Sequence, residues 1–251
     1  MKVLDEIHVP YRVVVERQEF DDYAKVLGAE RLLVLPQKYK DDYDVVDNLN
    51  LPQKGSGPAR NFVWDHAVST GAAWHWIMDD NIYKFYYFNR NLKHLCTSGR
   101  LFHDMESFCL RYKNISMAGP NYAMFVPRKQ VKAPFVVNTR IFSCQLIRND
   151  APFRWRARYN EDVDLSLRML KKKWCTVLFN AFLAAKIKTQ SLKGGNTDTI
   201  YQGGTYNKSK TLVEMHPDVA QMKWRFSRVH HIVNYKIFTH PLILADGIKE
   251  Q

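Results

Sequence analysis

The first 81 residues alternate between short apolar runs and polar helical stretches, and this alternation is the strongest constraint on the fold. Residues 9–15 and 31–36 are β-branched or aliphatic runs that predict strands, and residues 74–78 predict a third strand. Residues 18–27 and 59–70 lie between them and predict helices. The order strand, helix, strand, helix, strand is typical of an α/β sheet. We therefore expect a mixed, mostly parallel sheet flanked by helices.

The rest of the chain continues the mixture of helices and strands. The sequence predicts helices at 102–112 and from 160 onward, and strands at 115–118, 122–126, 135–148 and 175–179. No internal repeat, low-complexity tract or clear linker interrupts it. We expect one domain over residues 1–200, with a basic, helical C-terminal extension over residues 201–251 packed on it.

The charge of the chain is strongly basic, at +12, and the excess lies after residue 60. Residues 61–251 carry 28 basic and 14 acidic side chains. Such an excess indicates a polyanionic partner, either nucleic acid or a phosphorylated ligand. For the tripeptide at 171–173 alone, the solvated end of a helix is the favoured explanation of the three lysines.

Membrane insertion and a disulfide framework are not indicated. No apolar run reaches the roughly 18 residues that a membrane span needs. The four cysteines are far apart and form no metal-binding pair. We expect a soluble, cytoplasmic protein with no membrane partner.

An acidic cluster follows the predicted strand at 74–78. Asp79, Asp80 and Asn81 fall where an open α/β sheet binds its ligands, at the carboxyl end of a strand. Carboxylate and amide oxygens suit Mg²⁺ or Mn²⁺, which in turn would hold a diphosphate. A polar turn is the alternative, since Asp and Asn favour turns.

A glycine-rich loop precedes the predicted helix at 59–70. The loop ends on Gly57, and Arg60 and Asn61 follow in the first turn of the helix. A helix N-terminus can receive an anion, and an arginine fork suits phosphate or ribose oxygens. Lys193 in the later glycine-rich loop would also contact phosphate. The spacing fits neither a phosphate-binding P-loop nor a dinucleotide fingerprint, so an ordinary capped helix remains the alternative.

A second acidic pair opens the predicted helix near residue 160. Asn160 is expected to cap the helix, and Glu161 and Asp162 lie in its first turn, where the helix dipole favours ionised carboxylates. An ionised carboxylate can accept the proton of a substrate hydroxyl, although complementarity to the dipole alone would also explain the pair. Together, the acidic cluster, the loop with Arg60 and this pair match what transfer of a sugar from a nucleotide diphosphate requires.

Five blocks of the sequence, in order, resemble one family. The blocks are GPARNFVWDH at 57–66, HWIMDDNI at 75–82, NTRIFSC at 138–144, RYNEDVDLSLR at 158–168 and KGGNT at 193–197. They are similar to the TET-associated glycosyltransferases of bacteriophages and bacteria, and the resemblance spans about residue 9 to about residue 240.

The resemblance implies a GT-A-like enzyme. It would move a sugar from a nucleotide-sugar, a UDP-sugar first of all, to 5-hydroxymethylcytosine in DNA, the product of a companion TET-like dioxygenase. A phage-encoded enzyme would work in the cytoplasm of the bacterial host. The cofactor would be Mn²⁺ or Mg²⁺ held by Asp79, Asp80 and Asn81, and Glu161 or Asp162 would be the catalytic base.

The expected binding residues complete this picture. The donor would be bound by Gly57, Arg60, Asn61, Asp79, Lys193, Gly194, Gly195 and Asn196. The DNA would be contacted by Arg140, Arg158, Arg225 and Arg228.

Two alternatives remain at this point. GT-A domains normally open with a strand that contacts the donor base, whereas this chain begins a few residues before what resembles the second strand. A non-catalytic DNA-binding module with a degenerate GT-A fold is therefore one alternative. A glycosyltransferase with a protein or glycan acceptor is the other.

Overall fold

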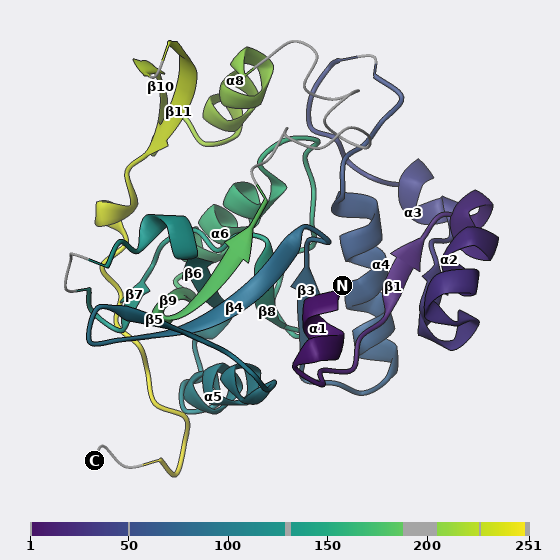
Figure 1. The fold of residues 1–251 in the computed structure, drawn as a ribbon. Coiled ribbons are helices and arrows are strands. Elements are labelled where there is room, and N and C mark those ends of the chain that lie inside the picture. The colour runs from purple at the N-terminus through teal and green to yellow at the C-terminus, as the bar shows by residue number, and fades with distance from the viewer. Residues whose placement is uncertain (1, 50, 129–131, 188–204, 226, 249–251) are drawn as a thin grey trace.

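The structure is a computed structural model and describes residues 2–49, 51–128, 132–187, 205–225 and 227–248. Its elements belong to a mixed α/β fold with a large sheet between helices (Figure 1). The described α-helices are α1 (Lys2–Glu6), α2 (Phe20–Leu27), α3 (Gln37–Asp41), α4 (Gly57–Ser69), α5 (Arg100–Cys109), α6 (Glu161–Lys171) and α8 (Tyr206–Met215). The described strands are β1 (Val13–Val15), β2 (Leu32–Val34), β3 (Trp74–Met78), β4 (Ile82–Asn89), β5 (Leu92–Leu95), β6 (Ile115–Tyr122), β7 (Phe135–Val137), β8 (Cys144–Arg148), β9 (Cys175–Lys186), β10 (Ala220–Arg225) and β11 (Arg228–Val233).

Seven of the described strands form the large sheet. Its order is β3-β8-β6-β9-β4-β5, and β7 also pairs with β9. Within these strands β6 and β9 pair in parallel, and every other pair is antiparallel. The mixed sheet flanked by helices is therefore confirmed, but the expectation that it would be mostly parallel was wrong.

The reason lies in how the first three strands pair. β1 and β2 do form a parallel pair around α2, as the alternation predicted, but they make a small sheet of their own. β3 pairs antiparallel with β8, a strand about 70 residues later in the chain. The local order of elements predicts a βαβ unit correctly, but it cannot specify which distant strand β3 will join.

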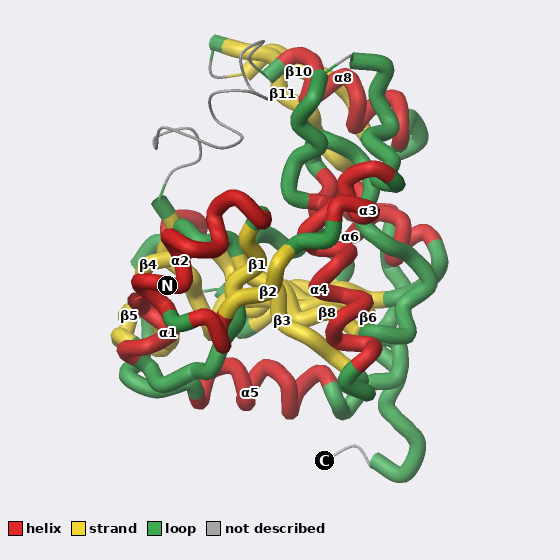
Figure 2. Tube along the Cα trace, turned by 90° about the vertical axis from the view of Figure 1, so that its right-hand side faces the viewer, coloured by secondary structure: helices red, strands yellow, loops and turns green. Residues whose placement is uncertain are grey.

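Two helical layers cover the large sheet on opposite faces. On one face α1 and α5 pack through Leu4, Leu101 and Met105. On the other face α4 and α6 pack through Trp64 and Leu165, among others. Figure 2, turned by 90°, shows α5 on one side of the strands and α4 and α6 on the other. Adjacent strand residues such as Met117 and Ala118 alternate between these two cores, as the period of a strand requires.

The long strand expected at 135–148 is two shorter strands. β7 ends before Asn138 and β8 begins after Ser143, and both of these residues have a left-handed backbone, with φ of 57° and 47°. Such conformations interrupt a strand because an extended chain requires negative φ. The strand expected at 122–126 is also absent from these residues: β6 ends at Tyr122, and a 3₁₀ turn follows at Ala123–Phe125.

The C-terminal region contains one helix and a hairpin, so the expected helical extension is only partly helical. α8 packs on the antiparallel pair β10–β11, which lies above α6 in Figure 1. Val163 and Leu167 of α6 share a small core with Leu212 of α8 and with Val219 and Ala220. The C-terminal region therefore packs directly on the helix that begins with the second acidic pair.

Two further expectations concern compartment and oxidation state. Among the helices that the structure describes, none is long and apolar enough to cross a membrane. The four cysteines (Cys96, Cys109, Cys144 and Cys175) are buried free thiols in the core.

Candidate active site

Three strands of the large sheet run in the same direction and end at the same edge. β3 and β6 are both antiparallel to β8, and β9 is parallel to β6. Their carboxyl ends therefore bring together Asp79, Tyr122 and Lys186, from positions far apart in the sequence. This edge is where an α/β sheet positions ligand-binding side chains.

Asp79 lies at the centre of this edge. Its Oδ1 atom is 2.8 Å from Nη2 of Arg60, and its Oδ2 atom is 2.8 Å from Nζ of Lys186. Oδ2 also accepts a hydrogen bond of 2.6 Å from Oγ of Ser143. Burial by itself would raise the pKa of Asp79, but the charges of Arg60 and Lys186 outweigh it and lower that pKa. Asp79 is therefore an ionised carboxylate held between two cations.

Arg60 joins the two acidic ends that the sequence singled out. While Nη2 donates to Asp79, Nη1 lies 3.2 Å from Oε1 of Glu161. The guanidinium lies over the ring of Trp155, with Cζ 4.7 Å from the ring centroid. Ser56, just before α4, donates a hydrogen bond of 2.9 Å to the same Glu161 oxygen. The turn after β3 and the start of α6 thus face one site.

Asp162 differs from its neighbour Glu161 in its surroundings. Burial and the nearby Glu161 charge raise the pKa of Asp162 to about 6, although Arg60 and Lys208 act in the opposite direction. One of its oxygens accepts a hydrogen bond from the backbone N–H of Val163. A carboxyl group with a raised pKa accepts protons more readily than an ordinary aspartate near neutral pH.

Asn160 precedes α6 but does not cap it through its side chain. Its backbone is left-handed, with φ of 54°, and its side-chain amide donates a hydrogen bond of 2.7 Å to the carbonyl of Lys208 in α8. The expected capping role was therefore wrong. The left-handed turn instead aims Asn160 at the C-terminal region and directs the chain into α6.

The acidic cluster does not fit the expected divalent cation. Both oxygens of Asp79 are already bound to Arg60 and Lys186, Asp80 is exposed, and Asn81 is neutral. The side-chain oxygen of Asn81 is buried and has no hydrogen-bond partner within the described ranges, but one neutral amide oxygen is a poor donor set.

Charge repulsion argues in the same direction. A divalent ion at Asp79 would have to share this one carboxylate with two cations, Arg60 and Lys186, each of which lies 2.8 Å from one of its oxygens. The residues described here also contain no group of three or more His, Cys, Asp or Glu side chains that could hold a metal. The geometry thus gives no support to a metal at Asp79.

The expected donor-binding residues fall into three groups. Asp79 and Arg60 lie in the site, as described. Gly57 and Asn61 serve packing: a side chain on Gly57 would collide with Tyr43, and Asn61 exchanges two hydrogen bonds with the backbone of Trp155. Lys193, Gly194, Gly195 and Asn196 lie outside the described residues.

The four arginines expected to contact DNA also differ in their burial and position. Arg158 is buried and forms an ion pair of 2.9 Å with Asp47, so its position does not fit a DNA contact. Arg140 is half-buried over the ring of Phe142. Arg225 and Arg228 are exposed at the end of the β10–β11 hairpin.

Three side chains of the site were missed by the sequence argument. Lys186, Ser143 and Tyr122 form a connected group: Nζ of Lys186 donates to Oγ of Ser143 at 2.7 Å, and the Tyr122 hydroxyl lies 2.6 Å from that oxygen. The available signal was the apolar run that continues through residues 175–185 and ends on a lysine. It predicts a longer strand than the expected one at 175–179, with a cation at its carboxyl end.

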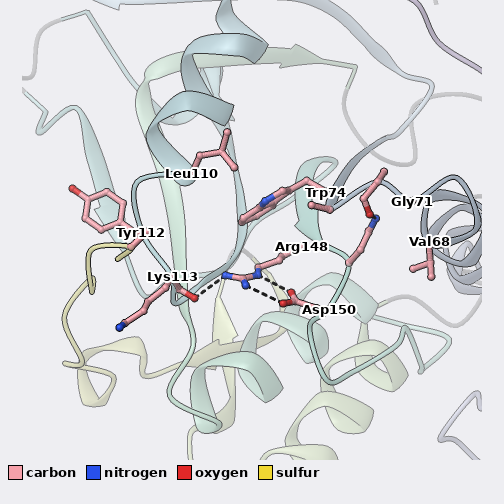
Figure 3. Close-up of a pocket in the computed structure, with 12 residues that line it drawn as sticks. Val68, Gly71, Trp74, Leu110, Tyr112, Lys113, Arg148 and Asp150 are labelled. Carbon is pink, nitrogen blue, oxygen red and sulfur yellow. Dashed lines mark hydrogen bonds and ion pairs between the residues drawn. The ribbon is translucent and has the colours of Figure 1, made fainter. Parts of the chain in front are cut away.

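A hollow of about 520 Å³ lies at the other end of β3 (Figure 3). Trp74, the first residue of β3, and Arg148, the last of β8, line it. Arg148 donates to both oxygens of Asp150 and to the carbonyl of Lys113. None of the charged side chains around Asp79 lines this hollow, so it is separate from the site.

Comparison with known proteins places the chain in one family. Residues 1–195 match the family described as TET-associated glycosyltransferase, which covers more than three quarters of the chain. The match includes α6 and β9, and therefore Arg60, Asp79, Glu161, Asp162 and Lys186. No curated protein and no solved structure matches the chain. The chain belongs to the family of TET-associated glycosyltransferases, and is a glycosyltransferase.

Proposed function

We propose that this glycosyltransferase moves a sugar from a nucleotide-sugar, a UDP-sugar first of all, to the hydroxymethyl group of 5-hydroxymethylcytosine in DNA. The observation that carries the proposal is the bridge formed by Arg60 between Asp79 and Glu161. The bridge joins the sheet edge, which suits the phosphate of the donor, to the start of α6, which suits the catalytic base that deprotonates the acceptor. We also propose that the large mixed sheet is a GT-A-like fold.

Asp162 is the base in this mechanism. A hydroxyl oxygen becomes a better nucleophile as its proton is removed, and the raised pKa of Asp162 suits that transfer. Glu161 is less suited because Ser56 and Arg60 already occupy one of its oxygens. Glu161 instead orients Arg60 and, through its charge, raises the pKa of Asp162.

The transfer step balances without a further reactant. The hydroxymethyl oxygen forms a bond to the anomeric carbon of the sugar, and the bond from that carbon to the donor phosphate breaks. The electron pair of the broken bond leaves with the nucleoside diphosphate, and the hydroxyl proton passes to Asp162. Arg60 stabilises negative charge on the departing phosphate, as a planar arginine fork does well.

The basic hairpin supports DNA as the acceptor. Residues 220–233 include Lys223, Arg225 and Arg228 and no acidic residue. Trp224 is 71% exposed, and strand alternation places it on the same face as His231. Burial, together with the charges of Lys208 and Arg140, lowers the pKa of His231 to about 4, and the charge of Lys208 also acts on Asp162.

A hairpin of this kind suits a nucleic acid. Its cations would contact phosphates, and an exposed indole would stack on a base or fill the gap that an extruded base leaves. The target base must leave the duplex for its substituent to reach Asp162. Oxidation of a methylcytosine, the reaction class of a TET-like dioxygenase, would supply the hydroxymethyl group, which agrees with the family description.

The decisive experiment measures sugar transfer directly. The chain is incubated with duplex DNA containing 5-hydroxymethylcytosine and a panel of nucleotide-sugars, each with EDTA and with Mn²⁺. We expect the modified nucleoside to gain the mass of one sugar, and we expect no gain on unmodified cytosine.

Assays with other acceptor molecules distinguish the proposal from its alternatives. Transfer to a peptide or an oligosaccharide, with none to DNA, would establish a protein or glycan acceptor. Salt-sensitive DNA binding without transfer from any donor would establish a non-catalytic DNA-binding module.

A further inference from the structure

Lys186 occupies the position where a divalent cation was expected. It is the last residue of β9, and its side chain is 11% exposed. Its Nζ atom lies 2.8 Å from Asp79, 2.7 Å from Oγ of Ser143 and 5.8 Å from the ring centroid of Tyr122. Groups from the ends of β3 and β6 and from the residue before β8 therefore fix this ammonium at the edge of the sheet.

The ammonium retains capacity for a ligand. It carries three N–H groups, and two of them are directed at Asp79 and Ser143. Within the part of the chain that the structure describes, the third has no protein acceptor. Arg60 holds the other oxygen of Asp79, so two cations face this single carboxylate.

We propose that Lys186, together with Arg60, binds the diphosphate of the donor and stabilises the nucleoside diphosphate as it leaves, in place of a divalent cation. This rests on the proposed function for the identity of the ligand. When the bond from the sugar to phosphate breaks, its electron pair stays on the phosphate oxygen. Lys186 donates a hydrogen bond to a phosphate oxygen and remains an ammonium throughout.

Inorganic pyrophosphate tests the site independently of the nucleoside and the acceptor. Calorimetric titration of the full chain in EDTA should show binding, and Mn²⁺ should change the affinity by less than about threefold. Replacing Lys186 by Met should weaken pyrophosphate binding by roughly 10-fold or more, the usual effect of losing a hydrogen bond to a charged group. Lys186→Arg keeps the charge and should retain most of the affinity.

Lys84 provides a matched control. It is an exposed lysine on β4, opposite Ala185 in the pairing with β9. Lys84→Met should leave pyrophosphate binding unchanged. The ratio of the affinity for pyrophosphate to the affinity for orthophosphate adds a second readout, because a partly unfolded sample would not change this ratio. The ratio should fall in Lys186→Met and stay constant in Lys84→Met.

The outcomes separate this inference from the proposed function. Pyrophosphate binding in EDTA that is lost in Lys186→Met supports the inference even if no sugar reaches DNA. Binding that requires Mn²⁺, or that Lys186→Met leaves intact, overturns it even if Mn²⁺-dependent transfer to DNA is found.

Discussion

His216 places its Nε2 atom 2.9 Å from Oδ1 of Asp164, and both side chains are buried. Asp164 belongs to α6, and His216 follows α8 directly. The guanidinium groups of Arg156 and Arg168 bind the same carboxylate. This contact connects the part of the chain that matches the family to the region beyond the match, which ends at residue 195.

We expect Asp164→Asn to lower the free energy of unfolding by about 3 kcal/mol, because it leaves two half-buried guanidinium groups without their carboxylate. Urea unfolding at pH 7 measures the loss. The control is Asp65→Asn, which removes an ion pair with Arg154 between side chains that are each more than 40% exposed. That change should cost about 0.5 kcal/mol.

The pH dependence of this loss has a defined sign. Burial alone would raise the pKa of Asp164, but its hydrogen bonds to His216 and Arg156 and the charges of the arginines lower it below 3.8. The carboxylate therefore stabilises the fold above pH 3.8, and its contribution is lost as the pH falls further. Equal losses for Asp164→Asn and Asp65→Asn at pH 7 would contradict the structural role given to Asp164.

A second prediction separates the two carboxylates at the start of α6. Asp162→Asn should lower kcat by roughly 100-fold or more, the range for loss of a general base. Glu161→Gln should lower it by only about 10-fold, because Glu161 orients Arg60 but does not take the proton. The measurement is the rate of sugar transfer to DNA at saturating donor. A larger loss for Glu161→Gln would exchange the two roles.

Stability should change in the opposite direction to activity in Asp162→Asn. The pKa of Asp162 is raised to about 6, so above that pH the folded protein carries a buried charge that it holds less favourably than the unfolded chain does. Removing the charge should stabilise the fold at pH 8 by on the order of 1–3 kcal/mol. The gain should vanish below pH 4, where the wild-type carboxyl is protonated, and thermal unfolding at both pH values checks it.

A third prediction concerns the pH dependence of the rate. In the proposed mechanism the ionised form of Asp162 accepts the proton, so kcat/KM should fall tenfold per pH unit below about pH 6. Besides Glu161, the charged groups that act on this carboxylate are Arg60 of α4 and Lys208 of α8. Lys208→Met should therefore move the acidic limb to higher pH. An unchanged limb in Asp162→Asn, assayed for its residual activity, would show that another group titrates.

A fourth prediction distinguishes surface arginines from a buried one. Arg225→Ala and Arg228→Ala should each reduce the slope of log affinity for DNA against log salt concentration by about 1, the effect of one lost phosphate contact. Arg12→Ala, at an exposed site before β1, should leave the slope unchanged. Arg158→Ala should instead lower the melting temperature, because Arg158 holds the buried Asp47. Fluorescence anisotropy over a salt series measures the slopes.

The parts of the site that were predictable from the sequence depend on local signals. The strand at 74–78 ends before Asp79, and α6 begins at Glu161, because apolar periodicity and a change to polar residues mark both boundaries. Arg60 was identified because a glycine-rich loop leads into its helix. These three residues then meet, as the sugar-transfer hypothesis required.

The parts that were not predictable depend on contacts between distant residues. Lys186 meets Asp79 across 107 positions of sequence, and only the pairing of β3, β8, β6 and β9 brings them together. Gly57 was assigned to the donor, but its lack of a side chain makes room for Tyr43. Arg158 was assigned to DNA, but a carboxylate 111 positions earlier holds it inside the fold.

Helix α6 connects both ends of the catalytic arrangement. Its first turn carries Asp162, and its second turn adds Leu167 to the core shared with the C-terminal region. Asn160, which precedes the helix, donates a hydrogen bond to the carbonyl of Lys208 in α8. A shift of the C-terminal region relative to α6 would have to break these contacts or carry the start of α6 with it. Under the proposed function, acceptor binding at the hairpin and proton transfer at Asp162 would therefore be coupled through α6.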